Sequence, residues 1–150
     1  MMKYTEKMSK RLNELLEKNY DAEKGYKRAA EIVDNSKLKQ FFENQAQYRN
    51  KFGHELKTEI TNFGETPEKG TSITADAHRV WMSIKSTFTS NDEEAILKEV
   101  QKGELAAVEE YNEIINDTTL PPTTKSILSK QRTGIETALQ SVKNFEVMVS

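Results

Sequence analysis

Residues 64–72 read Gly-Glu-Thr-Pro-Glu-Lys-Gly-Thr-Ser, a turn-rich run between two long amphipathic patterns that decides the fold. The whole connection covers residues 64–91, about 28 residues, whereas a hairpin between helices needs only a few. A short amphipathic pattern inside it predicts a helix over Thr74 to Ser86 that lies across the bundle. Such a connection can return along a helix of about 40 Å and start the third helix beside the start of the second.

Four long helical patterns flank this connection. Apolar residues recur at spacings of three and four from Met8 to Val33, and a second such pattern follows from Leu38 to Phe63. The break between them is only Asp34-Asn35-Ser36, so these two helices should pack antiparallel. Ser90-Asn91-Asp92-Glu93 forms a capping box that opens the third pattern, Leu120-Pro121-Pro122 ends it, and Thr123 or Thr124 should cap the fourth helix.

The predicted architecture is an all-α single domain over residues 1–150, a four-helix bundle with one long crossover between helices two and three. An up-down-up-down bundle is the alternative topology, and it would leave the long connection unexplained.

Composition excludes several classes of chemistry. Lys plus Arg number 22 against 24 for Asp plus Glu, with mixed signs, so neither nucleic acid nor an anionic membrane is an expected partner. Cysteine is absent, which excludes disulfides, thiolate metal sites and a Cys nucleophile. No apolar run has the length of a signal peptide or membrane span, so a cytoplasmic location is expected. No phosphate loop or nucleophile motif occurs, and no catalytic residue is predicted.

Polar side chains nevertheless fall on the apolar stripes. An advance of about 100° per residue places Asn19 near the centre of the first stripe, and Glu104 lies as far into its helix as Arg49 into its own. The residues expected in one mid-bundle polar layer are Asn19, Glu23, Gln45, Arg49, Glu104 and Gln131. The sequence therefore predicts that all four helices contribute to this layer.

Several short motifs resemble a bacterial family of ferritin-like four-helix bundles of unknown function. They are Leu12-Asn13-x-Leu15-Leu16, Asp21 with Gly25-Tyr26-x-x-Ala29-Ala30-Glu31, His78-Arg79-x-Trp81, Gly103-Glu104 and Leu120-Pro121. The resemblance spans nearly the whole chain and implies a ferritin-like fold and a bacterial origin, and it allows a stress-related role. The activity of that family is itself undetermined.

Two hypotheses explain the polar layer. Ferritin-like metal sites use Glu from two helices and Glu-x-x-His from two others, but neither histidine of this chain follows a Glu by three positions. The leading hypothesis is therefore a buried ion pair of Arg49 with Glu104 or Glu23 that fixes helix register and does no chemistry. The rival is a non-standard carboxylate site for iron or manganese, built from Glu23, Glu55 and Glu104.

The predicted crossover helix carries a second cluster, formed by His78, Arg79 and Trp81. One interpretation is a surface for a partner or an anionic or planar ligand, and the other is that the tryptophan fills a seam of the bundle. Gly25 and Gly103 lie inside predicted helices, which indicates close helix approach or room for a bulky neighbour such as Tyr26.

Three functions follow from these patterns. The leading expectation is a non-enzymatic, self-associating ferritin-like bundle with no cofactor. The alternatives are a metal-binding or oxidoreductase protein with an unusual carboxylate site, and a protein-interaction module that uses the crossover helix.

Overall fold

The computed structural model describes residues 3–67, 81, 84, 88–117 and 119–149. Its long helices are α1 (Tyr4–Ile32), α2 (Ser36–Asn62), α4 (Glu93–Ile115) and α5 (Pro122–Val149), and a 3-10 turn η1 (Ser90–Asp92) precedes α4. Within these ranges no strand occurs. The short helix predicted over Thr74 to Ser86 lies outside the described residues, apart from Trp81 and Ile84.

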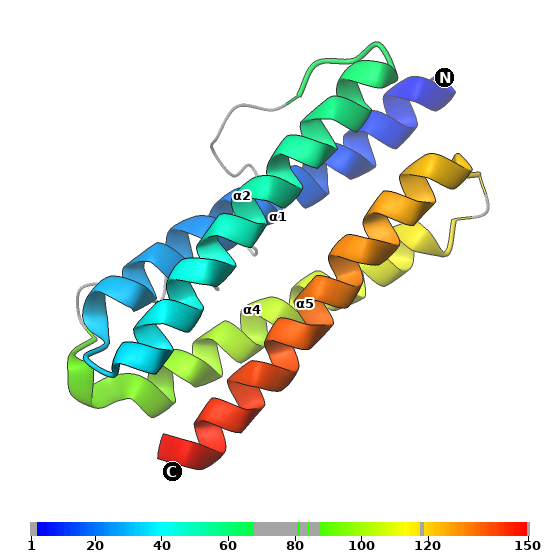
Figure 1. Ribbon diagram of the computed structural model, residues 1–150. Helices are drawn as coiled ribbons and strands as arrows, with labels where there is room; N and C mark the ends of the chain where they lie inside the picture. Colours follow the sequence, from blue (N-terminus) through cyan, green and yellow to red (C-terminus); the bar gives the residue numbers. More distant parts are fainter. Residues whose placement is uncertain (1–2, 68–80, 82–83, 85–87, 118, 150) are drawn as a thin grey trace.

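The helices form a one-crossover bundle. The chain leaves α2 at one end of the bundle and enters α4 at the opposite end, so α4 starts at the same end as α2 (Figure 1). Helix α1 packs against α2 and α4, and α5 packs against α4 and α2. Every packed pair is thus antiparallel, while the parallel helices α2 and α4 face each other across the bundle axis. This arrangement confirms the predicted topology and excludes the up-down-up-down alternative.

The helix ends differ slightly from the prediction. Asn35, within the predicted break, caps α2, because its Oδ1 accepts a hydrogen bond from the Leu38 amide at 3.0 Å. The capping box before α4 is formed by Thr89 with Asp92, and not by Ser90 with Glu93.

Helix α5 also starts differently from the prediction, at Pro122. This position suits proline because the first helical residue needs no amide hydrogen. Thr124 is consequently inside the helix, where its buried hydroxyl donates to Glu59 Oε1 at 2.8 Å.

The apolar core is divided into two clusters. One lies around Tyr26, Phe42 and Val100, and the other around Leu12, Leu56 and Leu128. On α1, α2 and α4 the positions between the two clusters are those of Asn19, Arg49 and Glu104, which are polar and buried, and on α5 the buried Gln131 lies between Leu128 and Ile135 of the second cluster. A buried polar layer therefore lies at mid-height of the bundle, with apolar packing above and below it.

Trp81 fills a seam between α1 and α4. Its side chain is 3% exposed, and a Cβ built on Gly25 or on Gly103 would lie 2.4 or 2.5 Å from its ring atoms. The two helical glycines therefore make room for an indole, and the sequence-based expectation that Tyr26 was the bulky neighbour is corrected. Tyr26 lies beside this seam instead, with its ring centroid 5.0 Å from that of Trp81.

We expect Gly103→Ala to lower the free energy of unfolding by about 1–3 kcal/mol, because the new methyl group overlaps the Trp81 ring. Chemical denaturation measures this. The matched control is Gly53→Ala, whose Cβ would meet only Leu16 Cδ1 at 3.5 Å. Ala is the better helix former by roughly 1 kcal/mol, so this control should gain stability. Equal effects of the two substitutions would contradict the packing of Trp81 against Gly103. The same holds if Gly103→Ala costs as much stability in a Trp81→Ala background as in the wild type.

Candidate functional site

The centre of the polar layer is an ion pair between the facing helices α2 and α4. Arg49 Nη1 donates to Glu104 Oε1 at 2.6 Å, and the two side chains are 1% and 0% exposed. Because α2 and α4 are not packed neighbours, this contact joins them across the bundle axis. A buried charge without a partner is very costly, so each of these residues requires the other.

Hydrogen bonds extend this pair to α1. Arg49 Nε donates to Asn19 Oδ1 at 2.6 Å, and the side-chain Nδ2 of Asn19 donates to the Leu15 carbonyl at 2.8 Å. Tyr26, also on α1, donates its hydroxyl hydrogen to Glu104 Oε2 at 2.9 Å. Both oxygens of Glu104 therefore accept hydrogen bonds, which is the satisfaction that a buried carboxylate needs.

The network then continues to α5. Asn19 Nδ2 donates to the Tyr111 hydroxyl at 3.0 Å, and that hydroxyl donates to Gln131 Oε1 at 2.6 Å. Gln131 Nε2 in turn donates to Glu55 Oε1 at 3.1 Å, at the half-buried edge of the layer. One connected network therefore runs through all four helices.

Burial and charge together fix the protonation states in the layer. Burial raises the pKa of Tyr111 to about 12. Burial also raises the pKa of Tyr26 well above its ordinary value, and the neighbouring Glu104 carboxylate raises it further. For Arg49, burial disfavours the cation, but the adjacent Glu104 carboxylate and its hydrogen bond, together with Tyr111 and Tyr26, outweigh this and the pKa is raised. The tyrosines thus stay neutral donors and the guanidinium stays charged.

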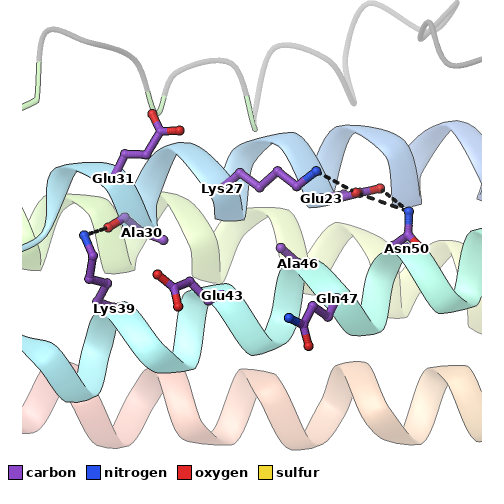
Figure 2. A pocket seen from close by; sticks show the side chains of 9 residues that line it. All are labelled: Glu23, Lys27, Ala30, Glu31, Lys39, Glu43, Ala46, Gln47 and Asn50. Carbon is purple, nitrogen blue, oxygen red and sulfur yellow. Dashed lines mark hydrogen bonds and ion pairs between the residues drawn. The ribbon is translucent and has the colours of Figure 1, made fainter.

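Four of the six residues predicted for the layer lie in it, namely Asn19, Arg49, Glu104 and Gln131. Glu23 does not, because its position on the flank of the stripe turns it toward an outer groove between α1 and α2. There its carboxylate pairs with Lys27 Nζ at 3.0 Å and accepts from Asn50 Nδ2 at 3.3 Å (Figure 2). Gln45 is half-buried and lines a separate groove between α2 and α5.

Sequence reasoning missed Tyr26 and Tyr111 as members of the layer, because it counted both as apolar stripe residues. A signal for them exists in the spacing. Tyr26 follows Asn19 by seven residues, and Tyr111 follows Glu104 by seven, which places each hydroxyl-bearing side chain two turns along the same face.

Among the described residues, the three carboxylates considered for a metal site do not come together. Glu23, Glu55 and Glu104 are not one ligand set, since Glu104 is bonded to Arg49 and Tyr26, Glu55 to Gln131, and Glu23 to surface groups. The Arg49 cation moreover occupies the middle of the layer, where a dication would be repelled. In the part of the chain that the structure describes, no group of three or more His, Asp or Glu side chains could hold a metal ion.

The cluster predicted on the crossover helix is only partly described. His78 and Arg79 lie outside the described residues. Trp81 is buried between α1 and α4, so the interpretation of this residue as part of an exposed ligand surface is corrected in favour of a seam-filling role. Among the described helices, none is long and apolar enough to cross a membrane.

Comparison with known proteins places this architecture in a family. The family described as Domain of unknown function (DUF2383) matches residues 7–117, and the chain belongs to it. A comparison with curated proteins found no match.

Solved structures share the fold at low identity. A mutant of Dps1 from Mycobacterium smegmatis superposes with a TM-score of 0.76 at 14% identity, covering 95% of this chain and 96% of that chain. A dodecameric thioferritin, the bacterioferritin-related protein of Bacteroides fragilis, gives 0.78 at 17% identity, covering 97% and 87%. A ferritin-like, diiron-carboxylate protein from Bacillus anthracis gives 0.62 at 17% identity, covering 99% and 96%. These likenesses establish a ferritin-like fold.

Because burial raises the pKa of Tyr111 to about 12, folding stability should fall as pH rises. The stability contributed by the neutral Tyr111 hydroxyl is complete below about pH 10, the pKa of tyrosine in the unfolded chain. It is lost between about pH 10 and pH 12, because in that range the tyrosine ionises in the unfolded chain but not in the folded one. The stability advantage of the wild type over Tyr111→Phe should therefore shrink by about 1 kcal/mol between pH 9 and pH 11. Urea denaturation of both proteins at each pH measures this, and an advantage independent of pH would contradict the assignment.

Proposed function

We propose that this protein is a non-enzymatic ferritin-like bundle in which a structural ion-pair network takes the place of a metal centre. One observation carries the proposal, the 2.6 Å contact between Arg49 and Glu104 at the centre of the layer. A carboxylate that faces a fixed guanidinium and a neutral tyrosine has both oxygens engaged. It is therefore a poor ligand for iron or manganese.

The layer has a physical role that requires no chemistry. Its hydrogen bonds are directional, so they hold the four helices at one relative height, whereas apolar contacts alone permit sliding by a turn. Buried polar groups are known to specify helix register in this way, at some cost in stability. The family resemblance allows a stress-related role for this scaffold.

Self-association is part of the same proposal. The thioferritin with a similar fold is described as dodecameric, and exposed apolar side chains lie on this chain at Tyr48, Leu105, Val147 and Met148. Apolar side chains on the surface of a bundle are candidates for an interface between copies. Light scattering after size exclusion should give a mass that is a multiple of the 17.2 kDa protomer, and a mass of one protomer would contradict self-association.

The alternative function is a carboxylate metal site of unusual composition, supported by the diiron-carboxylate protein among the structural neighbours. It requires Glu104 to leave Arg49 and to bind an ion together with Glu55 or another carboxylate. This rearrangement would strand the Arg49 guanidinium in the core without its counter-ion, at a cost of several kcal/mol.

Anaerobic titration with Fe(II) and with Mn(II), followed by calorimetry, separates the two functions. We expect no saturable binding at micromolar concentration, and the same weak heats from wild type, Glu104→Gln and the control Glu94→Gln. The control removes a carboxylate that is half exposed on α4.

The outcome that contradicts the proposal is a saturable micromolar isotherm in the wild type that disappears in Glu104→Gln and persists in Glu94→Gln. Such a result would assign Glu104 to a metal site and make the ion pair a state of the metal-free protein.

A further inference from the structure

A groove of about 350 Å³ lies between α2 and α5. Its apolar surface comes from Phe52 on α2 and from Ile135 and Ala138 on α5, with Tyr48 at its side. The volume is within the range of small-molecule sites, which are mostly apolar with a few polar groups. The two helices are neighbours in the bundle (Figure 1).

The charges on this groove are all of one sign. Lys51, Lys130 and Arg49 belong to its lining, and no Asp or Glu does. The outer groove between α1 and α2 differs, since Glu23, Glu31 and Glu43 line it together with lysines. Arg49 is neutralised by Glu104, so the exposed Lys51 and Lys130 supply the positive charge that favours an anionic ligand here.

Arg49 carries an unused donor beneath this wall. Its Nε and Nη1 are hydrogen-bonded to Asn19 and Glu104, but its Nη2 is buried and has no hydrogen-bond partner. Buried donors without an acceptor are rare, and an acceptor that reaches one gains the interaction without a competing bond to water. This unsatisfied donor belongs to the residue that connects the groove to the polar layer.

We propose that the groove between α2 and α5 binds a carboxylate carried on a short apolar chain. The carboxylate would pair with Lys51 and Lys130 at the mouth of the groove, while the chain lies on Phe52 and Ile135. An aliphatic chain is complementary to the largely apolar surface of the groove, and a single negative charge is complementary to its lysines. This site goes beyond the proposed function, because it does not depend on whether Glu104 can bind a metal.

Octanoate is the probe, and octanamide, which has the same chain without the charge, is the matched ligand control. A ligand of about ten non-hydrogen atoms at ordinary efficiency should bind with a Kd on the order of 1 mM. Titration followed by 1H–15N correlation spectra of the full-length chain measures binding and locates it. We expect shifts at amides of α2 and α5 around the groove, and binding of octanamide that is weaker by about fivefold or more.

Two variants test the contacts. Lys51→Met/Lys130→Met removes two exposed cations at the groove and should weaken octanoate binding by about fivefold, without an effect on octanamide. Its charge-matched control is Lys98→Met/Lys102→Met, because both lysines are exposed on α4, away from the groove, and this control should bind as the wild type does. Ser141→Leu, which fills the groove from α5, should abolish binding of both ligands.

Several results would overturn the site. One is the absence of octanoate binding at a concentration 20-fold above the expected Kd of about 1 mM. The others are equal affinity for octanoate and octanamide, and octanoate binding that is unchanged in Lys51→Met/Lys130→Met. Shifts confined to other helices would overturn it equally. None of these outcomes bears on the metal titration, so the two proposals fail separately.

Discussion

The buried ion pair between Arg49 and Glu104 is the constraint on which the rest of the bundle depends. It joins α2 and α4, which are not packed neighbours, and its two side chains are almost completely withdrawn from water. Two charges at this depth are tolerated only with good mutual geometry and further hydrogen bonds. Asn19 and Tyr26 provide these bonds from α1, so three helices are fixed at one height before any apolar contact is counted.

The surrounding packing protects this pair from water. One apolar cluster lies on each side of the layer, and Trp81 closes the seam between α1 and α4 next to Tyr26. The indole fits only because Gly25 and Gly103 lack side chains, and these glycines immediately precede Tyr26 and Glu104 in sequence. The residues that form the layer and those that seal it are thus adjacent along the same two helices. The fold is ferritin-like, and at the centre of its polar layer a guanidinium faces a carboxylate.

The fold was predictable from the sequence because the topology of the bundle depends on helix and loop lengths and on apolar periodicity, all of which can be counted along the chain. The one-crossover order followed from residues 64–91 alone. Prediction of the site was less complete, since a helical wheel places Asn19 and Glu104 at the core but cannot decide which way a flank residue such as Glu23 turns. It also classes tyrosine as apolar, although the hydroxyls of Tyr26 and Tyr111 carry the network. The partner of Gly25 and Gly103 was predicted wrongly because Trp81 is distant in sequence and reaches the seam only through the tertiary fold.

A double-mutant cycle on the ion pair tests the central claim most directly. Arg49→Met and Glu104→Gln are made singly and together, and the free energy of unfolding is measured by urea denaturation. A structural pair predicts that each single change costs about 3–5 kcal/mol, because it leaves a buried group uncompensated, and that the double variant costs much less than the sum. Additive effects, within about 0.5 kcal/mol, would show that the two side chains do not depend on each other and would contradict the account.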